Sequence, residues 1–258
     1  MSGKWKRRTC FRREDGKKSD QFTSDWFSVE HNCEREVRQD SVSFFKGTVI
    51  LGMRFGAGTV KIGILAVQGD FEAHAAMLAR LDADSVEVRT PADLEGCDGL
   101  ILPGGESTTQ LQFLQEEGLA DAIGKFAQQG GAIFGTCAGA ILLATEVENP
   151  KQDSLKLLDM TVLRNAYGRQ IASDVVSGPT KLKKEPLEMV FIRGPVIERA
   201  GPDVEVLAEY AGKPALVQRD NIMAATFHPE LTDDTTVHEH FLSLVAAGTS
   251  QTTGSAKS

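Results

Sequence analysis

Hydrophobic residues alternate between short continuous runs and helical spacing from Val60 to Val147, and this alternation predicts the fold class. Short β-branched and aliphatic runs are typical of buried strands, whereas apolar residues three and four apart are typical of helices that cover a sheet. The predicted strands span residues 60–69, 85–90, 98–105 and 131–137, and the predicted helices span 70–83, 106–129 with a break near Gly118, and 138–147. Residues 91–97 are expected to form a turn. Strands that alternate with helices imply right-handed crossovers and a mostly parallel sheet covered on both faces.

The pattern changes after Pro150, where apolar runs follow one another with little room for helices. Strand-like sequences occupy residues 155–170, 189–197, 204–212, 213–220 and 221–227. Closely spaced strands predict antiparallel additions to the sheet. Residues 235–248 have the spacing of a closing helix, and the polar end that follows is expected to fray. We therefore predict one α/β domain over residues 60–246 and a flexible tail over 247–258.

Residues 1–59 differ in kind from the rest of the chain, because they are basic and polar and show no apolar period. They carry 12 Lys and Arg against 8 Asp and Glu, a net of +4, whereas the remaining residues carry −12, which together give the net charge of −8. No apolar stretch of about 7–15 residues follows the basic start, which argues against a signal peptide. We expect a disordered extension, or sequence translated upstream of a natural start at Met53. A regulatory or partner-binding arm is the alternative.

The acidic body and the lack of a long apolar run argue against two classes of partner. Phosphate contacts need clustered Lys and Arg, so we expect no nucleic-acid partner. A membrane span needs about 18 consecutive apolar residues, and no run in the sequence approaches that length, so no membrane partner is expected. Four cysteines, Cys10, Cys33, Cys97 and Cys137, are scattered without a C-x-x-C pair, which argues against a zinc site and a disulfide framework. Reduced thiols predict a cytoplasmic protein.

Cys137 lies in the sequence Gly135-Thr136-Cys137-Ala138-Gly139, between an apolar run and a predicted helix. This is the G-x-nucleophile-x-G elbow with cysteine in place of serine. Flanking glycines remove Cβ clashes where chain segments approach closely. The helix N-terminus leaves the N–H of Ala138 free to bind an oxyanion. An isolated cysteine is more often a buried structural residue, but the elbow makes Cys137 a candidate nucleophile.

A cysteine nucleophile needs a base that an acceptor holds in place, and His228-Pro229-Glu230 can supply both. In extended chain, residues i and i+2 point to the same side, so the imidazole and the carboxylate meet at the end of the preceding strand. In open α/β sheets the reactive crevice lies at the carboxyl ends of the strands, where Cys137 is also expected. Taken alone, a histidine in such a turn is more often an ordinary surface residue.

The other histidines are weaker candidates. His74 is expected on a helix face, although the preceding Gln68-Gly69 ends a strand and could approach the site. His238 and His240 lie two apart in a helix, so their side chains diverge and make a poor metal pair.

Pro103-Gly104-Gly105 follows a predicted strand and opens a helix, which suits a loop whose N–H groups line an anion site. Opposite a cysteine elbow this loop is a credible second donor to an oxyanion, although alone it could be an ordinary turn. Arg164 and Arg193 are the candidates for binding an α-carboxylate, because a guanidinium can form two parallel hydrogen bonds to the two oxygens of a carboxylate. By composition alone, each arginine is more often a surface residue.

Five segments, read together, resemble one family. They are ILPGGEST, FGTCAG, RNAYGRQ, FIRGP and TFHPELT, in this order within about residues 61–246. They resemble the glutaminase subunits of pyridoxal 5'-phosphate synthase, which are class I, triad-type glutamine amidotransferases. The elbow and H-P-E alone indicate the superfamily, and the other segments narrow it to the vitamin B6 branch. Gly194 stands where alanine is more usual in the family, and residues 1–59 have no counterpart in it.

The resemblance implies a three-layer, flavodoxin-like α/β fold and the hydrolysis of L-glutamine to L-glutamate and ammonia. It implies that Cys137 is the nucleophile, His228 the base and Glu230 the orienting acid, with an oxyanion hole formed by the amides of Gly105 and Ala138. The implied glutamine contacts are Gly105, Glu106, Ser107, Arg164, Ile192 and Arg193. It implies no cofactor and no metal. The implied partner is a (β/α)8-barrel synthase subunit in a hetero-oligomer, which would receive the ammonia through a channel for pyridoxal 5'-phosphate synthesis.

Three alternatives remain open from the sequence. The chain could be a glutaminase that serves another synthase, such as the histidine-pathway cyclase, although PGGES and RNxxGRQ argue against this. A cysteine peptidase or thiol-stress protein on a related scaffold would usually have histidine directly after the elbow cysteine, where this chain has Ala138. The third alternative is a binding subunit with a vestigial site, which an intact Cys137, His228 and Glu230 disfavours.

Overall fold

The computed structural model describes residues 60–165 and 173–252. The predicted extension over residues 1–59 lies outside the described residues, as do residues 166–172 of the RNAYGRQ segment and residues 253–258.

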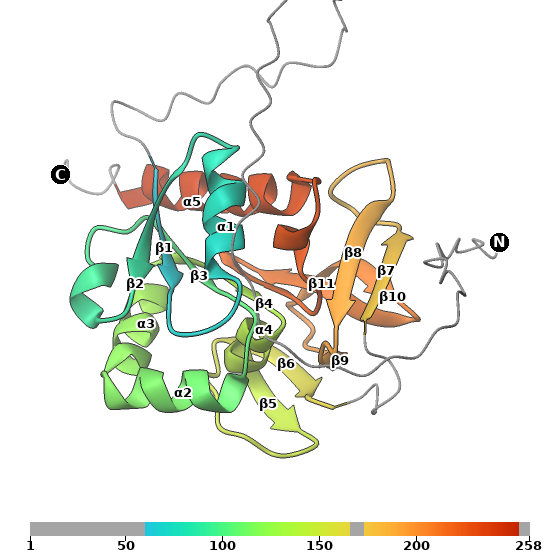
Figure 1. The fold of residues 1–258 in the computed structure, drawn as a ribbon, viewed down its shortest axis with the longest axis horizontal. Coiled ribbons are helices and arrows are strands. Elements are labelled where there is room, and N and C mark those ends of the chain that lie inside the picture. The colour runs from blue at the N-terminus through green and yellow to red at the C-terminus, as the bar shows by residue number, and fades with distance from the viewer. Residues whose placement is uncertain (1–59, 166–172, 253–258) are drawn as a thin grey trace, which may run out of the picture. The chain divides into compact units, whose positions relative to one another are not determined.

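A seven-stranded sheet forms the centre of the described chain (Figure 1), with the strand order β10-β11-β12-β4-β3-β1-β2. Its strands are β1 (Lys61–Leu65), β2 (Asp84–Val88), β3 (Gly99–Leu102), β4 (Ala132–Thr136), β10 (Glu205–Tyr210), β11 (Lys213–Arg219) and β12 (Ile222–Ala225). The run from β12 through β4, β3 and β1 to β2 is parallel. β10 and β11 are antiparallel additions at one edge. The predicted mostly parallel sheet with antiparallel additions is therefore confirmed.

Helices cover both faces of the sheet because its inner strands are apolar on both sides. On β3, Leu100 and Leu102 belong to one hydrophobic core, while Ile101 between them belongs to the other. The first core packs against α2 (Ser107–Glu116), α3 (Leu119–Gln128) and α4 (Ala138–Leu143), and the second packs against α1 (Phe71–Ala79) and α5 (Thr236–Thr252). These are the three layers of the predicted α/β fold.

Two small sheets and two short 3-10 helices complete the described chain. β5 (Ala144–Glu148), β6 (Leu158–Leu163) and β9 (Val196–Ala200) form one sheet, and β7 (Ser173–Gly178) pairs with β8 (Leu187–Ile192) in the other. The 3-10 helices are η1 (Pro91–Leu94), in the predicted turn, and η3 (Pro229–Leu231).

The predicted helix over residues 138–147 is wrong in its second half, because α4 ends at Leu143 and β5 begins at Ala144. The apolar run AILLA fits a buried helix, but Thr145 and Val147 are β-branched, which favours a strand, and residues 144–148 pair with β6. The predicted strand over residues 189–197 is two strands, β8 and β9, separated at Arg193-Gly194. The predicted break at Gly118 is confirmed, since its left-handed φ of 71° separates α2 from α3.

α5 continues to Thr252, four residues past the end of the helix predicted over residues 235–248. Polar residues can extend a helix whose backbone hydrogen bonds are satisfied internally, so the apolar spacing alone ended the helix too early.

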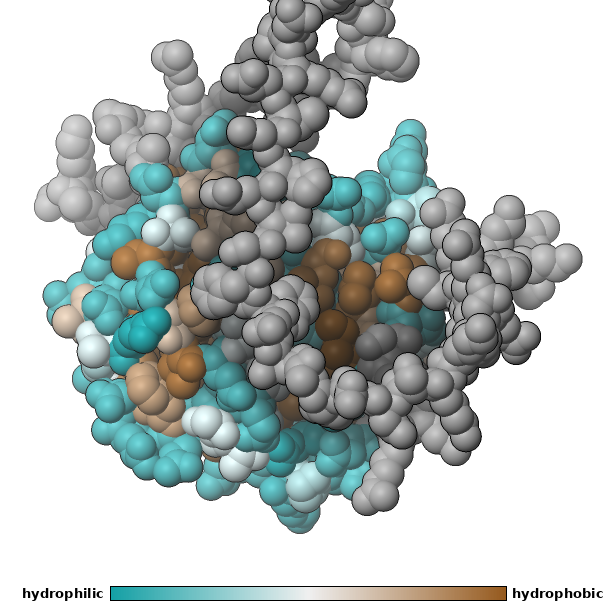
Figure 2. All heavy atoms as spheres, viewed as in Figure 1, coloured by the Kyte–Doolittle hydropathy of each residue, from teal (hydrophilic) through white to brown (hydrophobic). Residues whose placement is uncertain are grey.

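Exposed apolar side chains gather on one part of the surface. Val175 on β7, Ile192 on β8 and Leu231 on η3 are 48%, 37% and 42% exposed, and Figure 2 shows hydrophobic residues over β7 and β8. Among the described residues, no helix is long and apolar enough to cross a membrane.

Close backbone packing brings the first turn of α4 against β3 and β4. A Cβ built on Gly139 would lie 1.9 Å from the carbonyl oxygen of Leu102, and one built on Gly135 would lie 2.6 Å from the backbone of Gly139. Both flanking glycines of the elbow are therefore required by space, as the sequence predicted.

We expect Gly139→Ala to destabilise the fold by more than about 2 kcal/mol, because the added methyl group has no room beside the Leu102 carbonyl. Urea unfolding followed by circular dichroism measures the change. Gly124→Ala in α3 is the matched control, since no atom lies within 4 Å of the added Cβ. It should stabilise the chain by up to about 1 kcal/mol. Equal effects of the two substitutions would contradict the packing argument.

Candidate active site

Four loops meet at the carboxyl ends of four neighbouring parallel strands. Gln68 and Gly69 follow β1, Gly104 follows β3, Cys137 follows β4 and His228 follows β12. A Cβ on Gly69 would lie 1.8 Å from the carbonyl oxygen of Gly104, so these two loops touch through their backbones. The crevice at the strand ends lies where ligands bind in open α/β sheets.

Cys137 occupies a strained turn between β4 and α4. Its φ of 49° and ψ of −102° lie outside the regions that non-glycine residues favour. The conformation is held from both sides, because the Cys137 N–H donates to the Ala225 carbonyl at 2.8 Å and the Cys137 carbonyl accepts from Ile141. Cys137 is 8% exposed, and its side chain is one of the groups that raise the pKa of His228. The strain therefore places a nearly buried sulfur at the N-terminus of α4.

His228 and Glu230 form a buried pair at the start of η3. Nδ1 of His228 lies 2.8 Å from Oε1 of Glu230, and both side chains are buried. Burial opposes protonation of His228, but the hydrogen bonds and charges of Cys137 and Glu230 outweigh it and raise the pKa of His228 to about 10. Burial also raises the pKa of Glu230, against its hydrogen bond to His228. The imidazole is thus held between sulfur and carboxylate, favouring its protonated form.

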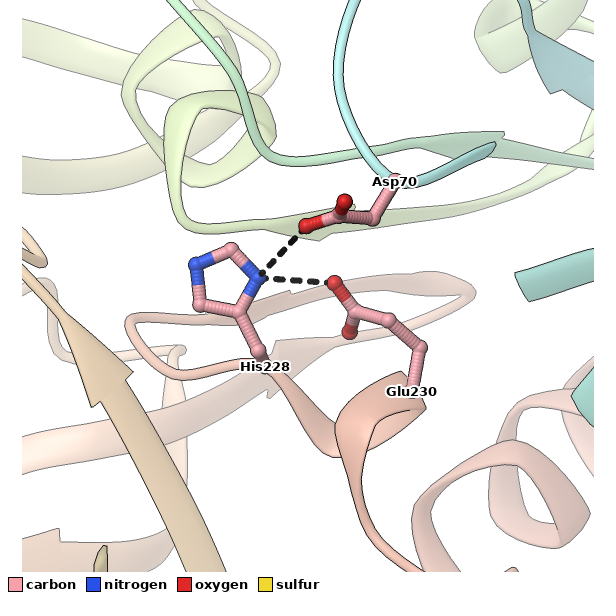
Figure 3. A group of neighbouring side chains, drawn as sticks. All are labelled: Asp70, His228 and Glu230. Atoms are coloured by element: carbon pink, nitrogen blue, oxygen red, sulfur yellow. Dashed lines mark hydrogen bonds and ion pairs between the residues drawn. The ribbon is translucent and has the colours of Figure 1, made fainter. Parts of the chain in front are cut away.

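Asp70 reaches the same imidazole from the loop after β1. Its Oδ2 lies 3.9 Å from Nδ1 of His228, and Figure 3 shows Asp70 and Glu230 approaching the ring from different elements. The ligand atoms of these three residues lie within 4.8 Å of one another, a spacing that could hold a metal ion. However, a metal ion on Nδ1 would have to displace the hydrogen bond to Glu230. We interpret the group as an electrostatic cluster around the imidazole.

The glycine loop after β3 packs directly on the imidazole. A Cβ on Gly104 would lie 2.5 Å from Cε1 of His228, so only glycine fits there. Gln110, fully buried on α2, clamps the loop, since its side-chain amide donates to the carbonyls of Gln68, Pro103 and Gly104 at 3.1–3.3 Å. Gln110 was not singled out from the sequence, because these contacts depend on how three segments pack.

Glu106 caps the N-terminus of α2 and pairs with Arg164. Its carboxylate accepts hydrogen bonds from the backbone N–H groups of Thr108 and Thr109 at 3.1 and 2.8 Å, and Arg164 lies 3.1 Å away. Burial opposes ionisation of Glu106, but these backbone hydrogen bonds prevail and lower its pKa to about 2. Arg164 also donates to Thr108. The pair therefore fixes Arg164 at the rim of the crevice.

A pocket of about 490 Å³ opens between these loops. Nine of the ten residues predicted for the site line it: Gly105, Glu106, Ser107, Cys137, Ala138, Arg164, Ile192, Arg193 and His228. Glu230, the tenth, lies behind His228. Arg193 has a left-handed φ of 45°, and this unusual conformation separates β8 from β9 at the pocket wall. The structure thus brings all the predicted residues into one place, while their chemical roles stay predictions.

The pocket also includes residues that the sequence did not mark as functional. Asp70, Ile141, Asn165 and Pro195 line it, as do Gln68 and Gly69, whose approach was foreseen. Asn165 directly follows Arg164, and Pro195 lies two residues after Arg193, so closeness in sequence to a predicted glutamine-binding arginine could have indicated both. His74 and His238 lie close behind the pair of His228 and Glu230.

One family model and several relatives match this chain. The model of the SNO glutamine amidotransferase family matches residues 64–247. The pyridoxal 5'-phosphate synthase subunit PdxT of Koribacter versatilis is 52% identical over 191 residues, which cover 74% of this chain and 98% of the relative. PdxT of Fervidobacterium nodosum is 45% identical over 184 residues, covering 71% and 96%. A crystal structure of a glutamine amidotransferase, 45% identical, has a TM-score of 0.68 and covers 71% of this chain and 98% of that one.

Glu106→Ala should lower the free energy of unfolding at neutral pH by about 1 kcal/mol, the usual cost of a lost N-cap. The ion pair with Arg164 should add little to this cost, because the side chain of Glu106 is 48% exposed. A pKa lowered from 4.5 to about 2 means that the charge-dependent stabilisation is present above pH 4.5 and is lost as the pH falls through about 2. The difference between wild type and variant should therefore shrink as urea titrations move from neutral to acidic pH.

Glu117→Ala, at the other end of α2, is the matched control for this titration. A carboxylate at a helix C-terminus is unfavourable, so its removal should leave stability unchanged or slightly higher. A difference for Glu106→Ala that grows toward low pH would contradict the cap.

Proposed function

The chain belongs to the SNO glutamine amidotransferase family and is a glutamine-hydrolysing subunit of pyridoxal 5'-phosphate synthase, and from this premise we propose that Cys137, His228 and Glu230 carry out the hydrolysis. The observation that supports this most is the buried hydrogen bond between His228 and Glu230, with Cys137 and His228 lining the same pocket. It has the nucleophile, base and orienting acid that a thiol-dependent amide hydrolase needs.

Glutamine would enter with its carboxamide toward Cys137 and its α-carboxylate toward the arginines. Arg164 already pairs with Glu106, which positions it but takes up part of its hydrogen-bonding capacity. Among the described residues, Arg193 makes no such ion pair and lines the same pocket, so it is the stronger candidate for the α-carboxylate. Gly105, Glu106, Ser107 and Ile192 would complete the contacts to glutamine.

In the first half-reaction, the sulfur of Cys137 attacks the carboxamide carbon as a thiolate. The amides of Gly105 and Ala138 would stabilise the oxyanion of the tetrahedral intermediate, each such donor contributing on the order of 3 kcal/mol. The protonated His228 gives its proton to the nitrogen as the C–N bond breaks, so that ammonia leaves and a thioester remains. This step uses the protonated form of His228 that its neighbours favour.

In the second half-reaction, His228 takes a proton from water, which attacks the thioester carbon. The C–S bond breaks, glutamate leaves and the thiolate is restored. Glu230 holds the imidazole in the tautomer that keeps its other nitrogen turned toward the sulfur. Nucleophile, base and oxyanion donors all come from the chain itself, so the proposed steps require neither cofactor nor metal.

The ammonia would pass to a partner synthase subunit with a (β/α)8-barrel fold, in a hetero-oligomer and in the cytoplasm. A contact feature of this chain supports a partner at the pocket mouth. Ile192 lines the pocket and, with Val175 and Leu231, is one of the three large apolar side chains that are exposed in the described part of the chain. A partner that covers these side chains would also close the pocket from water.

The direct test is release of glutamate from glutamine by the chain, alone and with a pyridoxal 5'-phosphate synthase subunit added. We expect strong stimulation by this subunit and loss of turnover in Cys137→Ala, because the nucleophile is removed. Cys97→Ala is the matched control, since Cys97 lies after η1 and its thiol donates only to the Asp93 carbonyl. Activity that does not depend on this subunit would assign the chain to a different synthase, and full activity of Cys137→Ala would refute the triad.

Glu230→Gln should lower kcat by at least about tenfold yet leave more activity than Cys137→Ala, because the amide keeps the shape of the carboxylate but not its charge. Steady-state kinetics of the stimulated complex measures the effect. An unchanged kcat would mean that Glu230 does not orient His228.

A further inference from the structure

A second pair of histidines lies buried directly behind the proposed triad. His74 on α1 and His238 on α5 are both fully buried. Nδ1 of His74 lies 3.0 Å from Nε2 of His238, and Nε2 of His74 lies 3.1 Å from Oγ1 of Thr136, the residue before the nucleophile. Two helices distant in sequence thus place a hydrogen-bonded pair against the elbow.

The same Nε2 of His74 faces the far side of Glu230. Oε1 of Glu230 is bound to His228, whereas Oε2 is buried and has no hydrogen bond within normal distance in the described part of the chain. Nε2 of His74 lies 3.5 Å from this oxygen. A buried carboxylate oxygen without a donor is unfavourable, so this short gap matters.

The tautomers of the pair follow from which buried groups have partners. Burial, the largest cause, lowers the pKa of His74 well below its usual value and that of His238 to about 3, so both rings are neutral. If His238 donates from Nε2 to His74, then His74 carries its own hydrogen on Nε2, directed at Thr136 and Glu230. The reverse arrangement leaves the N–H on Nδ1 of His238 buried without an acceptor and turns a lone pair toward Glu230. The first arrangement is therefore favoured.

We propose that His74 is a positioning residue for glutamine hydrolysis, whose Nε2–H holds the second oxygen of Glu230 and so keeps that carboxylate ionised and directed at His228. His238 fixes the tautomer of His74 that can donate. The inference rests on the proposed triad of Cys137, His228 and Glu230 and adds a second support behind it.

The expected consequence is a change in pH dependence. Burial already raises the pKa of Glu230, and a donor to Oε2 opposes this rise by favouring the anion. The titratable groups that face Glu230 are His228, His74 and Asp70, with His238 behind His74. Removal of His74 should therefore let Glu230 take up a proton at higher pH, and the acidic limb of kcat should move upward.

The test compares His74→Leu with His74→Gln in the full chain bound to its synthase partner, with kcat and KM for glutamine measured across pH. His74→Leu should lower kcat by about 10- to 100-fold, the same range as when a residue that orients a metal-binding histidine is removed from other enzymes. It should also shift the acidic limb of the kcat profile to higher pH. KM should change by less than about twofold. His74→Gln can place an N–H near the position of Nε2 and should recover most of kcat. An unshifted limb in His74→Leu, or equal loss in both variants, overturns the proposal.

Two controls separate this proposal from the triad and from general damage. His240 lies on α5, the helix of His238, but its side chain hydrogen-bonds to Gln218 and not to the histidine pair. His240→Gln should therefore behave as wild type. If Cys137→Ala is active, the triad itself fails, whereas an inactive Cys137→Ala with a fully active His74→Leu refutes only the role of His74.

If His74→Leu does not fold, His238 carries the test. His238→Gln keeps a donor for Nδ1 of His74 and His238→Phe does not, so only His238→Phe should shift the acidic limb. An acidic limb of kcat at the wild-type pH in both His238→Gln and His238→Phe would overturn the proposal.

Discussion

The site depends on one close contact, the packing of the first turn of α4 against the end of β3. Gly139 approaches the Leu102 carbonyl so closely that any side chain would collide with it. This contact fixes where α4 begins and therefore where Cys137 stands relative to the loop after β3. Gly104 then packs on the ring of His228 for the same reason, the absence of a Cβ. The relative positions of Cys137, His228 and the glycine loop after β3, the proposed nucleophile, base and oxyanion donor, are thus set by backbone packing, which deforms less than side-chain packing.

Burial determines the protonation of the residues that lie behind Cys137 and His228. Glu230 is surrounded by side chains that exclude water, so its charge is unfavourable unless neighbours compensate it. His228 does so on one oxygen, and the neutral His74 is placed to do so on the other. The same exclusion of water strengthens each of these interactions, because the local dielectric is low. A small shift of α1 or α5 would therefore change the pKa of Glu230, which reaches the pocket only through His228.

The sequence predicted those parts of the site that are encoded locally. The elbow around Cys137 and the pair of His228 and Glu230 each lie within five residues, so spacing alone places their side chains together. The strand β5 was missed because Ala144–Glu148 follows α4 directly with no Gly or Pro between them, and its strand conformation comes from pairing with β6. β7 was missed because SDVVSG has only two apolar residues in a row, and its strand conformation comes from pairing with β8. His74 was placed on a helix face but not beside Glu230, since their contact joins segments far apart in the chain and depends on the packing of α1, β4 and α5.

The openness of the pocket bears on why such a chain would work as a subunit. Ammonia leaves the proposed intermediate neutral, since His228 supplies only one proton to the departing nitrogen. In bulk water at neutral pH it would gain a further proton and lose the lone pair that makes it a nucleophile. A pocket rimmed by the exposed Ile192, beside Val175 and Leu231, cannot prevent this alone, but a docked partner covering these side chains would exclude water from the same space. In the proposed mechanism, a partner docked on the apolar rim would close the site to solvent, and His228 would then supply the only proton that the departing ammonia receives.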